Sequence, residues 1–295
     1  MMSRRHIPLS LAARSALSAL ALFAHRPVAT AADEVARLRL ADGVEMAYVD
    51  RGAGDPTLVF IHCGNCQMGI WKETFDAFAP TNRVVAMDLP GHGRSGANRQ
   101  TWSMEGLGAD VAALVEHLQL RRSVLVGNSL GGPTALEAAK RLGPSRVLGV
   151  VAVDTLHNVE FVWPEENFNN MLASYRKDFS ATCDAAMLQL VSQSAPQETK
   201  DRIARETCDN DRKAFLRLFE TLRSYDQASA MRAVGVPVRA INATLFPTAV
   251  EINRKYVPSF EVVLMQGVGH YPQVERPAEF QQHLRRLVSE LAAGK

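Results

Sequence analysis

The chain reads Gly127-Asn128-Ser129-Leu130-Gly131 directly after the apolar run Ser123-Val124-Leu125-Val126. A G-x-S-x-G pentapeptide that follows a strand is typical of a nucleophile elbow, a sharp turn from strand to helix that holds the serine hydroxyl at the carboxyl edge of a sheet. Such a turn leaves no room for side chains beside the serine, and glycine avoids the clash because it has no Cβ. The Ala-rich segment 132–140 favours the helix that should follow. Ser129 is therefore predicted to be a nucleophile.

Strand and helix patterns alternate around this turn. Residues 35–40 and 44–49 flank Asp42-Gly43, a pair typical of a β-hairpin turn. Further strands are expected at 57–61, 83–87, 147–153, 236–241 and 260–265, and helices at 68–78, 104–118 and 277–291. Buried strands that alternate with helices predict a mostly parallel sheet covered on both faces.

The alternation stops from residue 157 to residue 232. This stretch is helical in composition and contains no convincing strand, so we predict a helical cap inserted into an α/β core that comprises 32–156 and 233–295. Apolar side chains stand at the entrance of the cap, namely Phe161, Trp163, Phe168 and Met171. They are expected either to line an apolar pocket or to form the cap's own core.

A serine hydroxyl becomes an effective nucleophile when a base, normally histidine, takes its proton and a third group orients that base. His270 lies in the glycine-rich segment Gly267-Val268-Gly269-His270-Tyr271-Pro272, just after the last predicted strand. The other histidines lie near the N-terminus, on predicted helices or after earlier strands. Because a serine that precedes its histidine in the chain fits such an elbow, His270 is the predicted base.

These residues give the chain a resemblance to the α/β-hydrolase family over about residues 35–291. Besides the elbow at Ser129, the matching segments are His62 to Trp71, Asp88-Leu89-Pro90-Gly91-His92-Gly93-Arg94-Ser95-Gly96, and Gly269-His270-Tyr271-Pro272 followed by Glu275-Arg276-Pro277. The resemblance implies an α/β fold with a mostly parallel eight-stranded sheet, helices on both faces and an inserted helical cap.

The resemblance also implies an oxyanion hole built from two backbone N–H groups. One belongs to Leu130, just after the nucleophile. The other belongs to the loop after His62, where the family usually has His-Gly-x and this chain has His62-Cys63-Gly64. We expect the N–H of Gly64 to be this second donor, and we expect His62 and the loop 88–96 to be structural supports.

The orienting acid departs from the pattern that the resemblance implies. Most relatives carry it after the strand that ends here at Ile241, but Thr244 occupies the expected position. Asp154 follows the preceding core strand, and neighbouring strands lie about 4.8 Å apart, so its carboxylate can reach the same imidazole. We predict Asp154 as the acid, while Glu251, no acid at all, or an Asp154 that merely caps a turn are the alternatives.

Composition restricts the classes of function. A chain of 295 residues with 47% apolar residues is long enough for one large α/β domain with an insertion. Its net charge of +2 gives no support for nucleic-acid binding. No second Cys or His pair stands at metal-ligand spacing beside Cys63 and Cys66, so neither a metal nor another cofactor is expected. The expected partner is a small-molecule substrate, and the oligomeric state stays open.

The first 31 residues have the layout of a secretory signal peptide. Arg4 and Arg5 precede the apolar stretch 7–24, and Ala29-Thr30-Ala31 offers a small-residue cleavage site. We therefore expect export, to the bacterial periplasm or beyond. Arg14 leaves only 15–24 uncharged, which is too short for a lasting membrane anchor. The alternative is a disordered leader on a cytoplasmic protein.

The cysteines are even in number and so compatible with an oxidising compartment. Cys63-Gly64-Asn65-Cys66 has the C-x-x-C spacing of redox proteins, but no thioredoxin-sized unit surrounds it, and a place in the oxyanion loop is the favoured interpretation. After export we expect Cys183 and Cys208 to form a disulfide that joins two cap helices.

A serine at the elbow argues against the family branches that use an aspartate nucleophile. The predicted reaction is hydrolysis of a small or medium ester or lactone through an acyl-enzyme, with Ser129 as nucleophile, His270 as base and Asp154 as acid. The run Gly127–Gly132 is also similar to the elbow of enzymes that hydrolyse carbon-carbon bonds of ring-cleavage diketones, which is one alternative. A ligand-binding receptor on the same fold is the other, and turnover would separate the two classes.

Overall fold

A computed structural model describes residues 34–294, and the predicted signal peptide, 1–31, lies outside the described residues. The strands are β1 (Ala36–Arg39), β2 (Glu45–Arg51), β3 (Thr57–Ile61), β4 (Val84–Met87), β5 (Ser123–Asn128), β6 (Val147–Val153), β7 (Val238–Ala243) and β8 (Glu261–Met265). The helices outside the cap are η1 (Met68–Trp71), α1 (Lys72–Phe78), α2 (Met104–His117), α3 (Gly131–Leu142), α9 (Val250–Arg254), α10 (Pro272–Glu275) and α11 (Pro277–Ala292).

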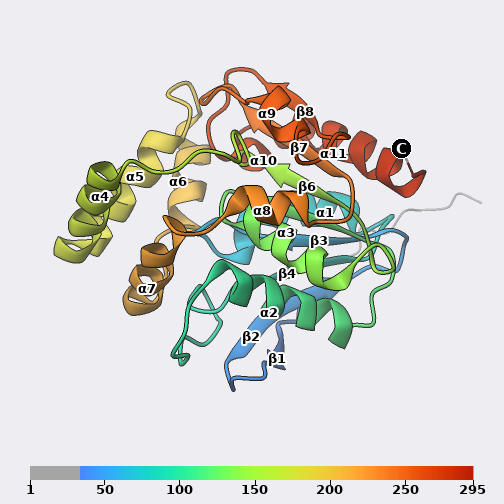
Figure 1. Ribbon diagram of the computed structural model, residues 1–295, viewed down its shortest axis with the longest axis horizontal. Helices are drawn as coiled ribbons and strands as arrows, with labels where there is room; N and C mark the ends of the chain where they lie inside the picture. The colour runs from blue at the N-terminus through green and yellow to red at the C-terminus, as the bar shows by residue number, and fades with distance from the viewer. Residues whose placement is uncertain (1–33, 295) are drawn as a thin grey trace, which may run out of the picture. The chain divides into compact units, whose positions relative to one another are not determined.

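Within these residues the strands form one eight-stranded sheet in the order β1-β2-β4-β3-β5-β6-β7-β8 (Figure 1). β2 pairs antiparallel with β1 and β4, and the remaining pairs are parallel. The mostly parallel eight-stranded sheet predicted from the sequence is therefore confirmed. Parallel pairing brings the carboxyl ends of β3, β5, β6 and β7 to one edge of the sheet, where the candidate site lies.

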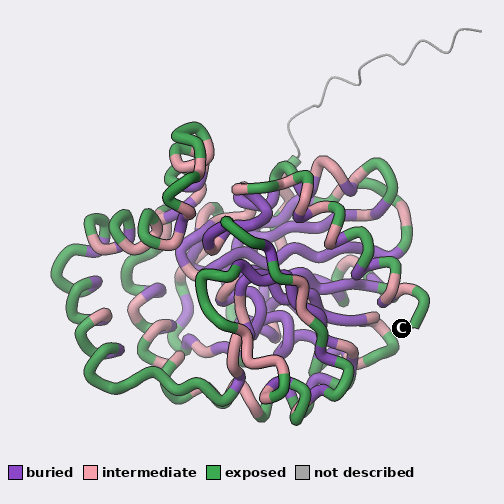
Figure 2. Tube along the Cα trace, turned by 90° about the horizontal axis from the view of Figure 1, so that it is seen from above, coloured by how far each residue is buried: buried purple, intermediate pink, exposed green. Residues whose placement is uncertain are grey.

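Two buried clusters, one on each face of the sheet, form the core. Val59 and Ile61 belong to the cluster that includes α2 and α3, whereas Leu58 and Phe60 belong to the cluster that includes α1 and α11. The split follows from strand geometry, because successive side chains of a strand point to opposite faces. Burial on both faces explains why β3, β4 and β5 read as continuous apolar runs (Figure 2).

The inserted segment contains α4 (Glu165–Lys177), α5 (Phe179–Leu190), α6 (Gln197–Arg205), α7 (Arg212–Leu222) and α8 (Gln227–Arg232). Figure 1 shows α4, α5, α6 and α7 to the left of the sheet, and α4, α5 and α7 share a small buried cluster around Tyr175 and Phe215. The last helix differs, because α8 packs on α3 and its Met231 is buried in the main core.

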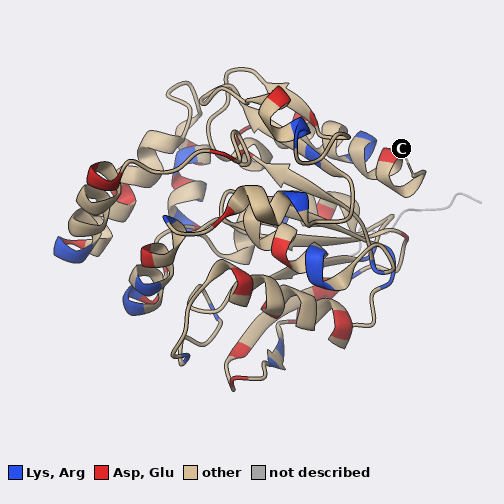
Figure 3. Cartoon of the chain, viewed as in Figure 1, with Lys and Arg blue, Asp and Glu red and all other residues tan. Residues whose placement is uncertain are grey.

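A disulfide joins Cys183 on α5 to Cys208, which follows α6, with 5.9 Å between the two Cα atoms. The pairing agrees with the sequence prediction that these two cysteines form a bridge, although only one end lies on a helix. Basic and acidic residues are both distributed along the helices (Figure 3). In residues 34–294 no helix has the length and apolar character needed to cross a bilayer.

Candidate active site

Ser129 occupies the turn between β5 and α3 in a left-handed backbone conformation, with φ of 53°. The glycines of the pentapeptide are required by close backbone approaches. A Cβ on Gly127 would lie 2.1 Å from the carbonyl oxygen of Gly131, and a Cβ on Gly131 would lie 2.4 Å from that of Ile61. The local sequence thus forms the strained strand-to-helix turn that presents a half-buried serine at the sheet edge.

Asp154 and His270 come together at the same edge, from the ends of β6 and β8. His270 Nδ1 lies 2.6 Å from Asp154 Oδ2, and the N–H of Ala243 donates to Asp154 Oδ1 at 2.9 Å. Burial opposes ionisation of this carboxyl, but contacts with His157 and His270 outweigh it and lower the pKa of Asp154 to about 2. Asp154 is therefore an anion beside the imidazole at neutral pH.

The alternative acid has no such contacts. Glu251 lies on α9 with its carboxylate exposed and paired with Arg254 at 3.0 Å. Thr244, at the position where the resemblance places an aspartate, is exposed and donates its hydroxyl to Gln266 Oε1. Among the carboxylates of the described chain, Asp154 is the one that contacts His270.

Asn128, which the sequence did not mark as functional, joins the turn at Ser129 to the segments of Asp154 and His270. Its Nδ2 donates to the carbonyl of Val153, which precedes Asp154, and to the carbonyl of His270, at 2.9 and 3.2 Å. Gln273 in turn donates to Asn128 Oδ1. Throughout residues 34–294 no hydrogen bond runs directly from Ser129 to His270, so this buried amide provides the contact between their segments.

The two predicted oxyanion donors have unoccupied N–H groups. Within the described residues neither Gly64 nor Leu130 donates its backbone N–H in a hydrogen bond. The carbonyl of Gly64 is held from behind, because it lies 2.8 Å from His92 Nε2 and accepts from Asn210 Nδ2 at 3.1 Å. These two contacts hold the Gly64 carbonyl in place and so fix the orientation of the loop that carries the Gly64 N–H. A donor group of an anion-binding site must be oriented in this way before the anion arrives.

His62 and Asp88 support the loops around the site, as the resemblance implied. The N–H of Leu89 donates to His62 Nε2 at 2.9 Å, so the neutral ring carries its proton on Nδ1 and donates it to the carbonyl of Cys63 at 2.7 Å. Burial, aided by the neighbouring His92, lowers the pKa of His62 to about 3. Asp88 accepts N–H bonds from Met68 and Arg94.

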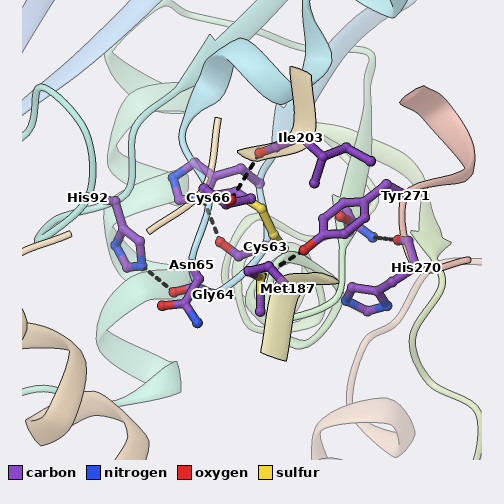
Figure 4. The surroundings of a disulfide bond; sticks show 12 residues. Cys63, Gly64, Asn65, Cys66, His92, Met187, Ile203, His270 and Tyr271 are labelled. Atoms are coloured by element: carbon purple, nitrogen blue, oxygen red, sulfur yellow. Dashed lines mark hydrogen bonds between the residues drawn. A yellow bond between two sulfur atoms is a disulfide. The ribbon is translucent and has the colours of Figure 1, made fainter. Parts of the chain in front are cut away.

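A disulfide joins Cys63 to Cys66 and closes the loop that carries Gly64 (Figure 4). From the sequence this C-x-x-C segment was expected in the oxyanion loop, and pairing of its cysteines was not predicted. Both cysteines are buried in the same cluster as Tyr271, whose hydroxyl donates to Met187 Sδ on α5. The bridge closes residues 63–66 into a covalent ring and so restricts the backbone of this loop.

The cap contacts this loop directly. The N–H of Cys208 donates to the carbonyl of Asn65 at 2.7 Å, and Asn65 Nδ2 donates to the hydroxyl of Tyr175 at 3.1 Å. A Cβ on Gly64 would lie 3.5 Å from the ring of Phe219, so this α7 side chain covers the loop. Phe219 and Asn210 could not be predicted as site residues, because nothing in the sequence around them distinguishes them from other cap residues.

The aromatic residues predicted at the cap entrance fall into two groups. Phe168 is buried at 3% exposure, whereas Phe161 and Trp163 are 57% and 44% exposed and meet edge to face. The half-buried Met171 packs against the cap's own buried cluster, so of the four predicted side chains only Phe161 and Trp163 form an exposed apolar surface. In residues 34–294 no group of three or more His, Cys, Asp or Glu side chains is arranged to hold a metal ion.

Comparisons with known proteins identify the family of this chain. Residues 58–282 match the model of the alpha/beta hydrolase family. The pimeloyl-[acyl-carrier protein] methyl ester esterase of Yersinia pseudotuberculosis is 26% identical over 245 residues, which cover 78% of this chain and 92% of that enzyme. A thermophilic esterase from Thermogutta terrifontis superposes with a TM-score of 0.76 at 21% identity, over 88% of this chain and 99% of that one.

A further relative matches only locally. The dihydrolipoyllysine-residue acetyltransferase component of the acetoin cleaving system of Pseudomonas putida is 38% identical over 96 residues, which are 32% of this chain. The match spans 26% of the length of that relative. The match over residues 58–282 covers more than half of the sequence, and the chain belongs to the alpha/beta hydrolase family.

Proposed function

We propose that the protein is a serine hydrolase that cleaves a small or medium carboxylic ester or lactone through an acyl-enzyme. The observation that carries the proposal is the 2.6 Å contact between His270 Nδ1 and Asp154 Oδ2 at the edge that presents Ser129. A proton held on Nδ1 leaves Nε2 as the basic nitrogen of the ring. The similarity to an esterase over 78% of this chain supports an ester as the substrate.

The proposed reaction proceeds in two steps. Ser129 Oγ transfers its proton to His270 Nε2 as it bonds to the acyl carbon, and the carbonyl electrons move to oxygen. The N–H groups of Gly64 and Leu130 stabilise this oxyanion. When the carbonyl re-forms, the leaving alcohol takes the proton from Nε2. Water then attacks the acyl-enzyme by the same route and releases the acid. In a lactone the alcohol stays tethered to the acyl group throughout, and the product is a single hydroxy acid.

The first experiment replaces the nucleophile. Ser129→Ala should lower turnover of p-nitrophenyl butyrate by at least about a thousandfold, because the hydroxyl that forms the acyl-enzyme is gone. Ser145→Ala is the matched control, since Ser145 follows α3 and its hydroxyl donates to the carbonyl of Leu142. A Ser129→Ala enzyme that keeps more than about a tenth of wild-type turnover would rule out the serine mechanism.

A second measurement needs no choice of substrate. A fluorophosphonate should add covalently to Ser129 of the wild type and not to the Ser129→Ala protein, as read by peptide mass spectrometry. We would then measure the turnover of an ester, a lactone and a ring-cleavage diketone by the same preparation. The substrate with the highest turnover indicates the class of reaction. Preference for the diketone would replace ester cleavage with carbon-carbon bond hydrolysis, and labelling without turnover of any would favour a receptor.

A further inference from the structure

We propose that His157 is a positioning residue for the Asp154–His270 pair, which it orients by directing its Nε2–H at the second oxygen of the Asp154 carboxylate. His157 Nε2 lies 3.5 Å from Asp154 Oδ1, while His270 Nδ1 lies 2.6 Å from Oδ2. One buried carboxylate thus has an imidazole at each oxygen. The inference rests on the proposed function, because it gives His157 a role in the same triad.

The backbone between the two residues turns sharply enough to fold His157 back over Asp154. Asp154 and Leu156 both adopt left-handed conformations, with φ of 45° and 54°, although neither is glycine. Non-glycine residues keep such conformations only where the surrounding structure holds them. Here Asn253 donates to the carbonyl of Leu156 at 2.6 Å, and the N–H of Ala249 donates to that of His157 at 2.7 Å.

Neighbouring polar groups determine which ring nitrogen of neutral His157 carries the proton. Asn242 Oδ1 accepts the N–H of Thr155, which makes the other end of this amide, Nδ2, a donor at 3.3 Å from His157 Nδ1. The hydroxyl of Thr248 accepts from Asn242 Nδ2 and can donate its own proton to His157 Nδ1 at 3.2 Å. His157 Nδ1 is therefore an acceptor, and the proton resides on Nε2, which faces Asp154.

No other hydrogen-bond partner accounts for this Nε2–H in the described part of the chain. The atom is buried without one, although the side chain as a whole is 20% exposed. The Phe246 ring meets the imidazole edge to face, with 5.7 Å between ring centroids. Asp154 Oδ1 is the charged acceptor within reach, and a slight closing of the 3.5 Å gap would make a charge-assisted bond.

The proposed role of His157 also gives a function to the end of β7, where the aspartate of most relatives is absent. At the end of β7 the fully buried Asn242 sets the tautomer of His157, and the N–H of Ala243 donates to Asp154 Oδ1. A carboxylate that accepts from both sides cannot rotate freely. His270 then receives an acceptor of fixed direction, which is what the third member of a triad supplies.

The test compares two substitutions with different hydrogen-bonding ability. His157→Leu removes the N–H and keeps apolar contact with Phe246, and it should lower kcat for p-nitrophenyl butyrate about tenfold with KM unchanged. His157→Gln places an amide N–H near the former Nε2 position and should restore most of kcat. The matched control is His283→Leu, since His283 is also a histidine near a carboxylate, 4.0 Å from Glu279, but lies on α11.

A spectroscopic measurement on the resting protein gives a second result that does not depend on the substrate. The His270 Nδ1 proton should produce a far-downfield proton NMR signal, assigned by its disappearance in Asp154→Asn. His157→Leu should shift this signal, whereas His157→Gln and His283→Leu should leave it in place. If the protein is not an esterase, this measurement still decides whether His157 is coupled to the pair.

Two outcomes would overturn the proposal. One is a His157→Leu protein with wild-type kcat and an unshifted signal, which would leave His157 without influence on Asp154. The other is an equal loss of kcat in the Leu and Gln variants with the signal unshifted in both, because packing against Phe246 would then account for the whole effect.

Discussion

Asn128 and Asp154 show how single side chains bring three distant segments to one point. Asn128 donates to carbonyls beside Asp154 and at His270, and Asp154 accepts from both His270 and the N–H of Ala243. Asn128, Asp154 and Ala243 are buried, and an unmet hydrogen bond inside a protein costs about 1–3 kcal/mol. The network is therefore expected to keep its geometry in the absence of substrate.

At the scale of single residues, the most discriminating prediction concerns Asp154, the proposed acid of the triad. Asp154→Asn should lower kcat about ten-thousandfold, because the amide presents the wrong partner to His270 Nδ1 and favours the wrong tautomer. Folding should be preserved, since Asn has nearly the same shape and its oxygen can still accept from Ala243. Glu251→Gln is the control, as Glu251 is exposed and paired with Arg254. Steady-state kinetics and a thermal melt of each protein provide the measurement, and equal kcat for Asp154→Asn and wild type would refute the assignment.

At the scale of elements, the segment after α6 and the loop after β3 act as one unit. Isolated β-bridges pair Cys66 with Thr207 and His92 with Asn210, and the N–H of Cys208 donates to Asn65. The same cap segment is attached to α5 through the Cys183–Cys208 disulfide. The position of the proposed oxyanion donor Gly64 consequently depends on how the cap is held.

Removing that disulfide tests the connection. The pair Cys183→Ala with Cys208→Ala should lose about 3 kcal/mol of unfolding free energy in urea, because a bridge across 25 residues restricts the unfolded chain. We also expect a lower kcat on esters, as Cys208 carries the contact to Asn65. The wild type treated with a mild reductant, compared with the untreated protein, serves as control. An unfolding free energy equal to that of the wild type would contradict the prediction.

The cysteines bear on export as well. Each of the four is paired among the described residues, and structural disulfides persist in oxidising compartments. This pairing supports the proposal that the protein is exported. Mass spectrometry of the alkylated, non-reduced protein should find no labelled thiol, and labelled Cys183 or Cys208 would count against both the bridge and export.

At the scale of the whole molecule, buried histidines make the fold sensitive to acid. Burial lowers the pKa of His62 to about 3 and lowers that of His92 as well. Below an ordinary histidine pKa of about 6.5 the unfolded chain binds protons that the folded protein refuses. Stability contributed by His62 is therefore complete above pH 6.5 and is lost as the pH falls toward 3.

Urea unfolding at a series of pH values should reveal this loss. At pH 5 the part due to His62 is about 2 kcal/mol, since each pH unit below the ordinary pKa costs about 1.4 kcal/mol. His62→Gln should flatten the dependence between pH 6.5 and 4.5, because glutamine does not titrate and can still accept from Leu89. His283→Gln should keep the wild-type slope, and the same slope in His62→Gln would show that His62 is not the cause.

Much of the fold could be predicted because local patterns determine it. Strands such as Thr57–Ile61 and Val147–Val153 have the predicted bounds, since burial on both faces requires continuous apolar residues. The short helices α9 and α10 were missed because four or five residues show no periodicity. The cap helices likewise could not be delimited one by one.

The sequence by itself determined the elbow, because only glycine fits where Gly127 and Gly131 meet neighbouring backbone, and it singled out His270 by its glycine-rich turn. The tertiary structure decided which carboxylate meets that histidine, across 116 residues, and that Asn210 reaches Gly64 across 146. Local patterns encode local conformation. Contacts between distant residues depend on strand order and on the packing of the cap, which no single segment specifies.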